Sequence, residues 1–169
     1  MFEKLYPKKY LSSVFELNPK ELKEKGIKAI FFDIDNTLVP YWIKTPDDKL
    51  KDFFKDLSDA GFTLAVLSNS REERSRTFCS EIPGMTYVFR AKKPLTKGFL
   101  ELSGKVGIEP AQTAIIGDQI FTDVLCGNLV GAYSILVKQV SPKDELITAP
   151  KRPFEKIVLR EYFKWEGQK

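Results

Sequence analysis

The stretch AIFFDIDNTLV, residues 29–39, joins a short apolar run to a pair of carboxylates. Its first four residues are apolar without alternation, which predicts a strand buried on both faces, as in a parallel sheet. Asp33 and Asp35 follow at once, and an extended chain would point both side chains to the same side. Such a pair repels itself unless a proton or a cation lies between the carboxylates, so we expect a hard divalent metal here. A solvated loop that caps the next helix is the alternative.

Expected strands and helices alternate along the chain. Strands are expected at 26–32, 62–67, 87–89, 113–116 and 133–137, and helices at 45–61, 71–80, 96–106 and 121–130. The first of these helices has a Thr45-Pro46 start, which predicts Thr45 as its cap. Buried strands that alternate with helices indicate an α/β fold, here a single three-layer α/β/α Rossmann-like domain with a mainly parallel sheet.

Length and composition exclude several classes of protein. The 169 residues, 43% of them hydrophobic, suffice for one domain with one core. The chain has no histidine, which excludes Ser-His-Asp and Cys-His catalysis and histidine zinc sites. Its two cysteines, Cys79 and Cys126, are expected to be reduced core thiols. The longest uncharged run, residues 124–137, is too short for a bilayer span of about 20 residues, so we expect a cytoplasmic protein.

Two more carboxylates follow the expected strand at 113–116, in the stretch GDQIFTD. Asp118 ends the strand, and Asp123 lies about one helical turn further on. Ligands of open parallel sheets bind at the carboxyl ends of the strands, so these acids should join the first pair in one pocket. An acid-rich helix N-terminus, which the helix dipole favours, is the alternative.

Groups that suit an anion follow two other strands. Lys93 lies in the stretch AKKP, where the proline disfavours helix and keeps the lysine in an extended loop. Ser68 and Asn69 follow the second strand and offer a hydroxyl and backbone N–H groups to phosphate oxygens. A solvated lysine pair and an ordinary helix cap at Ser70 are the alternatives. Together with the four acids, these groups indicate an anionic, phosphorylated substrate.

The order Asp-x-Asp-x-Thr, Ser, Lys-Pro and Gly-Asp-x-x-x-x-Asp resembles the haloacid dehalogenase superfamily of phosphotransferases over residues 28–137. The stretches DIDNTLV, RAKKPLTKGF, IGDQIFTDVLCGN and GAYSILV resemble the YqeG-type class III family, which includes phosphatidylglycerophosphate phosphatases. This second resemblance covers nearly the whole chain, so residues 1–169 are expected to form one hydrolase domain. It implies a Mg²⁺-dependent phosphoric monoester hydrolase that works through an aspartyl-phosphate intermediate.

The resemblance also implies a role for each matching residue. Asp33 would be the nucleophile, and Asp35 the general acid and then the general base. The metal would be held by the carboxylates of Asp33 and Asp118 and by the backbone carbonyl of Asp35. Asp123 would orient metal-bound water or the lysine. The transferring phosphoryl group would be bound by Lys93, Ser68, Asn69 and Thr37, of which Thr37 would also fix the loop after the nucleophile.

The intervals between the motifs are too short for a cap domain, so we expect an open site. An open site suits a phosphate on a large substrate, such as a lipid headgroup. Both ends of the chain are basic, with seven lysines against four glutamates in residues 1–28 and six basic against three acidic residues in 151–169. This charge is too modest to predict nucleic-acid binding. Aromatic and aliphatic residues recur at helical spacing in the C-terminal segment: Phe154, Ile157, Val158, Tyr162 and Trp165.

Two interpretations of these ends stay open. Basic amphipathic segments can lie on an anionic membrane, which would place the protein peripherally at the inner membrane surface. They can equally pack on the edge of the sheet with their lysines in water. The lipid phosphatidylglycerophosphate is the substrate that the resemblance favours. The alternatives are a soluble or protein phosphomonoester, a receiver-like signalling domain, and a non-catalytic phospho-ligand-binding protein. Mg²⁺ and Mn²⁺ both suit such a site.

Overall fold

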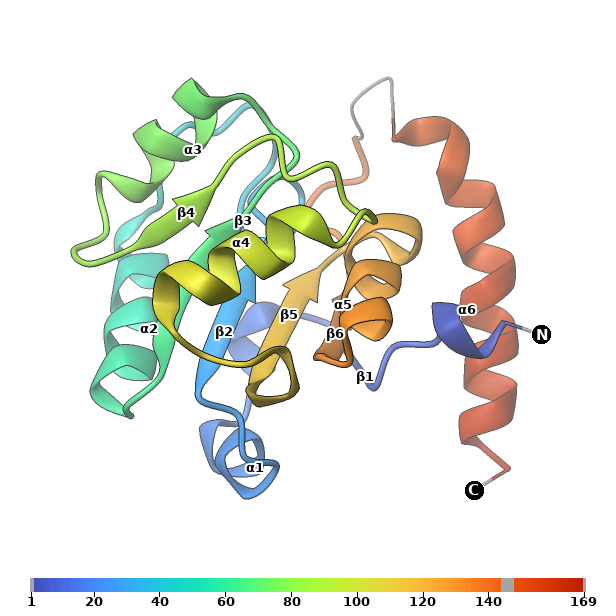
Figure 1. Ribbon diagram of the computed structural model, residues 1–169. Coiled ribbons are helices and arrows are strands. Elements are labelled where there is room, and N and C mark those ends of the chain that lie inside the picture. The colour runs from blue at the N-terminus through green and yellow to red at the C-terminus, as the bar shows by residue number, and fades with distance from the viewer. Residues whose placement is uncertain (1, 144–147, 169) are drawn as a thin grey trace.

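A six-stranded sheet, in which every strand pairing is parallel, runs through the middle of the computed structural model, which describes residues 2–143 and 148–168 (Figure 1). The strand order is β1 (Lys9–Leu11), β6 (Tyr133–Val137), β5 (Thr113–Gly117), β2 (Ala29–Phe32), β3 (Thr63–Leu67) and β4 (Thr86–Val88). Strand β2 is central, and its last residue lies opposite Val66 of β3 and Ile116 of β5. The segments that follow these three strands therefore leave the sheet side by side.

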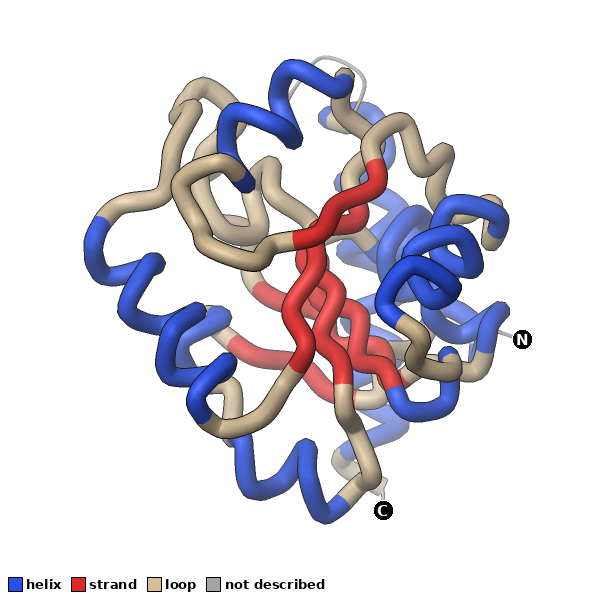
Figure 2. Tube along the Cα trace, turned by 60° about the vertical axis from the view of Figure 1, so that its left-hand side comes forward, coloured by secondary structure: helices blue, strands red, loops and turns tan. Residues whose placement is uncertain are grey.

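Helices cover both faces of the sheet, as the view in Figure 2 shows. They are α1 (Pro19–Glu24), α2 (Asp48–Asp59), α3 (Glu72–Cys79), α4 (Lys97–Val106), α5 (Leu125–Val130) and α6 (Arg152–Glu166). Side chains of α1, α2 and α3 pack in one buried cluster with Ile30 and Phe32 of β2. Side chains of α4 and α5 pack in a second cluster with Phe31 of the same strand. The expected three-layer α/β/α architecture is therefore confirmed.

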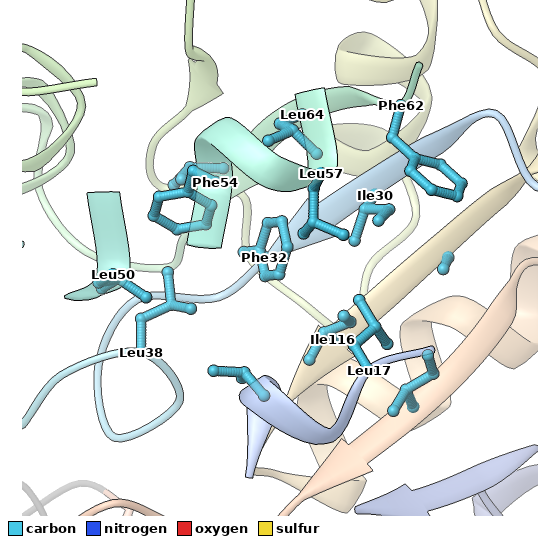
Figure 3. Close-up of a cluster of buried hydrophobic side chains, with 14 of the residues drawn as sticks. Leu17, Ile30, Phe32, Leu38, Leu50, Phe54, Leu57, Phe62, Leu64 and Ile116 are labelled. Carbon is cyan, nitrogen blue, oxygen red and sulfur yellow. The ribbon is translucent and has the colours of Figure 1, made fainter. Parts of the chain in front are cut away.

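Burial on both faces of the sheet explains why the sequence of β2 is continuously apolar. Successive strand residues point to opposite faces, and both faces of β2 are fully buried. Phe32 lies against α2, with 5.2 Å between its ring centroid and that of Phe54 (Figure 3). Phe31 lies against α4, with 5.0 Å between its ring centroid and that of Phe99.

The structure corrects two local predictions. The cap of α2 is Asp47, whose carboxylate accepts a hydrogen bond from the backbone N–H of Leu50 at 2.8 Å, so the prediction of Thr45 as cap is wrong. A carboxylate two residues closer to the helix reaches the unpaired N–H groups of the first turn better. The expected helix at 121–130 begins as a π-helical turn over Ile120–Val124 and continues as α5.

The two ends of the chain pack on the sheet edge. The N-terminal segment contributes β1, which pairs with β6. Helix α6 buries Val158 and Tyr162 in a cluster that includes Tyr6 and Tyr10. Four apolar side chains of this helix stay exposed, namely Phe154, Ile157, Phe163 and Trp165, and the rings of the last two also contact Tyr10 and Tyr6. The C-terminal segment therefore packs on the fold and also presents an apolar surface.

No cap domain is inserted between the motifs in residues 33–93, all of which the structure describes. A loop alone joins β2 to α2, and α3 alone forms between β3 and β4.

Cys79 and Cys126 are buried free thiols, and burial raises their pKa values to about 12 and about 11. Over the described ranges, none of the helices has both the length and the apolar character to cross a bilayer.

The packing of α2 predicts a large loss of stability for Phe54→Ala. The Phe54 side chain is 1% exposed, so its truncation leaves a cavity in the core that costs about 3–5 kcal/mol of unfolding free energy. Phe154, which is 63% exposed, provides the matched control, and Phe154→Ala should change stability by less than about 0.5 kcal/mol. Urea denaturation measures both values. Equal losses for the two variants would contradict this assignment of the core.

Candidate active site

Asp33 lies at the meeting point of the strand ends. It follows β2 directly, and its backbone N–H donates to the carbonyl of Ile116 in β5 at 2.9 Å. The Lys93 ammonium donates to Oδ1 of Asp33 at 2.9 Å. The Thr37 hydroxyl lies 3.4 Å from its Oδ2 and 3.0 Å from Oδ1 of Asp118. The structure thus brings together four of the residues that the motifs predicted, from three separate segments.

Lys93 is enclosed in the interior. Its ammonium donates to Asp33 Oδ1, to Asp123 Oδ1 at 2.6 Å and to the carbonyl of Leu67 at 2.7 Å, which uses all three of its protons. Burial lowers the pKa of Lys93, but the adjacent carboxylates of Asp123 and Asp33 outweigh this effect and raise the pKa above its ordinary value. Lys93 is therefore a permanent positive charge.

Asn69 and Ser68 shape the loop that carries the lysine. The Asn69 side chain accepts from the backbone N–H of Lys93 at 2.8 Å and donates to its carbonyl at 3.2 Å. The Ser68 hydroxyl, which is buried, accepts from the backbone N–H of Ser70 at 3.0 Å. The side chain of Asn69 thus positions Lys93, while its backbone amide lies in the segment predicted to bind phosphate oxygens.

The second acidic motif begins at Gly117, which packs closely against the side chain of Asp123. A Cβ atom at Gly117 would lie 2.1 Å from Cγ of Asp123, so only glycine leaves room for this carboxylate. The Asp123 carboxylate also accepts from the backbone N–H of Gln119 at 3.2 Å. The π-helical turn that contains Asp123 directs it back over the end of β5.

Asp35 has different partners from Asp33. Its Oδ2 accepts from the Ser70 hydroxyl at 2.5 Å, and its Oδ1 accepts from Nε and Nη2 of Arg74 at 3.0 and 2.9 Å. Both carboxylates line the same open cleft, so they share one site while they bind different partners. A tight turn begins at Ile34, whose carbonyl accepts from three successive N–H groups, and the chain does not stay extended.

Two residues of the C-terminal helix reach the site. The guanidinium of Arg152 donates to the backbone carbonyl of Asp118 at 2.8 Å and also binds Oδ2 of its carboxylate. Glu155 binds Arg152 and the backbone of the loop after Asp118. The sequence analysis missed both residues, and Arg74 as well, because none of them lies in a motif at a strand end.

A cluster of three carboxylates, which the structure describes in full, fits a hard cation. One oxygen each from Asp33, Asp118 and Asp123 lies within 4.8 Å of the others, and all three residues are buried. Burial raises the pKa of Asp33 well above its ordinary value; Lys93 opposes this shift, and three neighbouring carboxylates add to it. Burial also raises the pKa of Asp118 to about 7, although Arg152 and Thr37 act in the opposite direction.

The charges of the cluster are not balanced. The three carboxylates of this cluster face two cations, Lys93 and Arg152, and the second of these also binds Glu155. Negative charge is thus in excess, and the donors are oxygens, which suits Mg²⁺ or a similar ion. The predicted ligand set named Asp123 as an outer residue, whereas here its carboxylate belongs to the same cluster as Asp33 and Asp118.

An open cleft of about 790 Å³ leads to Asp33 and Asp35. Basic side chains line part of its wall, namely Lys44, Arg71, Arg74 and Lys151. The cleft therefore gives an anionic substrate a path to the buried carboxylate.

Comparison with known sequences identifies relatives over most of the chain. The sequence model of the family described as mitochondrial PGP phosphatase matches residues 4–140. A protein of Bacillus subtilis, named "Probable phosphatase YqeG", is 32% identical over 98% of this chain and 99% of its own length. The Arabidopsis thaliana protein named phosphatidylglycerophosphate phosphatase 1 is 28% identical over 85% of this chain, which spans 44% of that longer protein.

Solved structures share the fold. A deoxy-D-mannose-octulosonate 8-phosphate phosphatase of Haemophilus influenzae, in a cobalt-bound form, superposes with a TM-score of 0.54 at 19% identity, over 84% of this chain and 92% of that one. A haloacid dehalogenase family enzyme of Bacteroides thetaiotaomicron, in a magnesium complex, also gives 0.54 at 12% identity, over 72% and 98% of the two chains. The sequence matches show that the chain belongs to the PGP phosphatase family, and its fold is shared with a haloacid dehalogenase family enzyme.

Proposed function

We propose that this phosphatase is Mg²⁺-dependent and removes the terminal phosphate of phosphatidylglycerophosphate to leave phosphatidylglycerol. The observation that carries the proposal is the Asp33 carboxylate, held between Lys93 and Thr37 at the floor of an open cleft whose rim holds Asp35. The family match and the printed name of the Arabidopsis relative support this substrate. Residues 1–169 act in this proposal as one hydrolase domain.

The chain's own residues supply the groups that the reaction needs. Asp33 attacks phosphorus, and an aspartyl-phosphate forms while the bond to the glycerol oxygen breaks. Asp35 gives its proton to that leaving oxygen and later takes a proton from the attacking water. The ion pair with Arg74 and the hydrogen bond from Ser70 hold Asp35 at the cleft. A second displacement at phosphorus releases inorganic phosphate and restores Asp33.

Charge on the transferring group has its own partners. Lys93 offsets charge on the phosphoryl oxygens, and the hydroxyl of Ser68 with the backbone amide of Asn69 holds them. Thr37 fixes Asp33 relative to Asp118. When bound by Asp33, Asp118 and the backbone carbonyl of Asp35, Mg²⁺ offsets repulsion between nucleophile and phosphate. Asp123 orients Lys93, because its Oδ1 accepts a hydrogen bond from the lysine ammonium at 2.6 Å.

The open site and the C-terminal helix support a substrate at a membrane surface. No domain covers the cleft in the described part of the chain, so a phosphate on a lipid headgroup can approach it. Helix α6 exposes Phe154 and Ile157 on its outer face, next to the basic residue Lys156. This pattern suits peripheral contact with anionic lipid, which we place at the cytoplasmic face of the inner membrane.

The substrate assignment predicts which phosphate ester is hydrolysed fastest. Wild-type protein should release phosphate from phosphatidylglycerophosphate in mixed micelles much faster than from a panel of soluble phosphomonoesters, and a chelator should stop the reaction. Asp33→Asn should lose activity by at least about 10³-fold, because an amide cannot form the covalent intermediate. Phosphate release measures each rate. Asp56→Asn, an exposed position on α2, is the matched control.

Other outcomes of this assay lead to other functions. Faster hydrolysis of a soluble or protein phosphomonoester would keep the chemistry and refute the lipid substrate. Wild-type turnover by Asp33→Asn would refute the role of Asp33. Absence of turnover on every ester, with phosphate still bound, would favour a non-catalytic phospho-ligand-binding protein.

The raised pKa of Asp118, about 7, predicts that Mg²⁺ binding depends on pH. A protonated carboxyl must lose its proton to bind a cation, so binding should release protons at about pH 6 and release fewer at about pH 8.5. Affinity should rise with pH through about 7, as Asp118 loses its proton. Titration calorimetry in buffers of different ionisation enthalpy measures the protons released. The same affinity at both pH values would contradict the raised pKa of Asp118.

The proposed membrane contact predicts weaker binding to vesicles after loss of the exposed apolar pair on α6. The double variant Phe154→Ser/Ile157→Ser should bind vesicles of anionic phosphatidylglycerol at least roughly tenfold more weakly, because two apolar side chains no longer leave water. Co-sedimentation measures binding. Leu100→Ser, which changes an exposed leucine of α4, is the control. Equal binding by wild type and both variants would restrict α6 to packing.

A further inference from the structure

Helix α6 begins at Arg152, which reaches a residue 34 positions earlier in the chain. Nη1 of its guanidinium donates to the backbone carbonyl of Asp118 at 2.8 Å, and Nη2 binds Oδ2 of the same residue. The Asp118 side chain is 0% exposed, and that of Arg152 is 14% exposed. The planar, two-pronged guanidinium therefore holds both the backbone and the carboxylate of one residue.

Glu155 extends this contact to the loop that follows Asp118. Its Oε2 accepts from Nη1 of Arg152 at 2.9 Å. Its Oε1 accepts from the backbone N–H groups of Ile120 and Phe121 at 2.6 and 3.2 Å. Glu155 is 6% exposed, and a carboxylate so deeply buried is costly unless its charge and hydrogen bonds are satisfied, as they are here. Arg152 and Glu155 together form what we name the α6 clamp.

We propose that the α6 clamp positions Asp118 as a metal ligand, so that the C-terminal helix contributes to cation binding without itself touching the ion. This inference rests on the metal site of the proposed function. The hydroxyl of Thr37 lies at Oδ1 of Asp118 while Arg152 binds Oδ2, so the carboxylate is held at both oxygens. Such outer partners fix the orientation of a ligand, and their removal typically costs about 10–100-fold in metal affinity.

Helix α6 does not need the clamp in order to pack. It has a separate apolar anchor, because Val158 and Tyr162 are buried and the Tyr162 ring lies 5.8 Å from that of Tyr6. A cleft of about 980 Å³ along α6 is lined by Asp118 and both clamp residues. The match to the family's sequence model covers residues 4–140 and does not include this helix. Arg152 and Glu155 therefore contact the active-site loop, although neither lies in one of the four sequence motifs.

Mg²⁺ titration of clamp variants tests the proposal. In calorimetry, Arg152→Gln should bind Mg²⁺ about 10–100-fold more weakly than wild type, and Glu155→Gln about tenfold more weakly. Arg152→Lys should recover only part of the loss, because an ammonium lacks the second prong. Activity on a soluble phosphomonoester should fall at low Mg²⁺ and recover at saturating Mg²⁺ with KM for the ester unchanged. Arg76→Gln on α3 and Glu101→Gln on α4, both exposed, are matched controls.

The possible results separate the clamp from the proposed function. Lower thermal stability with unchanged Mg²⁺ affinity would make the clamp structural and overturn the inference. Tighter Mg²⁺ binding by Arg152→Gln would make the guanidinium a competing cation and overturn it as well. If wild type neither binds Mg²⁺ nor hydrolyses any ester, the proposed function fails first. If Arg152→Gln does not fold, Arg152→Lys and Glu155→Gln decide the question by the same titration.

Discussion

The concentration of negative charge at the ends of β2 and β5 is the constraint on which the rest of this structure depends. Asp33, Asp118 and Asp123 are buried with carboxylate oxygens within 4.8 Å of one another. Buried carboxylates this close repel one another strongly unless cations or protons compensate them. Lys93 supplies one compensating charge and Arg152 another, and the remaining excess is what a divalent cation would neutralise. The fold thus places three carboxylates, with an excess of negative charge, at one edge of the sheet.

The backbone around the site serves the same constraint. Parallel pairing of β2 with β3 and β5 brings three strand ends to one edge, so residues distant in sequence meet without long connections. Asn69 binds both backbone groups of Lys93, which fixes the lysine where its ammonium reaches two carboxylates. Gly117 leaves the space that the Asp123 side chain fills. Each of these local features would be unexplained in a protein that lacked the acidic cluster.

Local sequence predicted the parts of the site that lie at strand ends, because strand position alone determines where those residues go. The convergence of Asp33 and Asp118 follows from the parallel sheet, whereas Lys93 lies in the loop after β4 and is positioned by Asn69. The partner of Asp35 was not predicted, because Arg74 comes from α3 and only the tertiary fold brings the two together. The strand β1 was not predicted, since it lies in the charged stretch PKKYL and not in an apolar run. Arg152 and Glu155 were missed for the same reason as Arg74, because no local pattern marks a contact across 34 residues.

The different partners of the two carboxylates in the first motif support different tasks for them. Asp33 is enclosed with Lys93. Burial and the neighbouring carboxylates raise its pKa, and Lys93 opposes them. Asp35 lies at the cleft with its oxygens held by Arg74 and Ser70, close to where a leaving group would emerge. A nucleophile must stay ionised beside a cation, whereas a general acid must exchange its proton with the substrate oxygen and then with water. A turn begins at Ile34, and the two acids, which are two residues apart, line one cleft while they bind different partners.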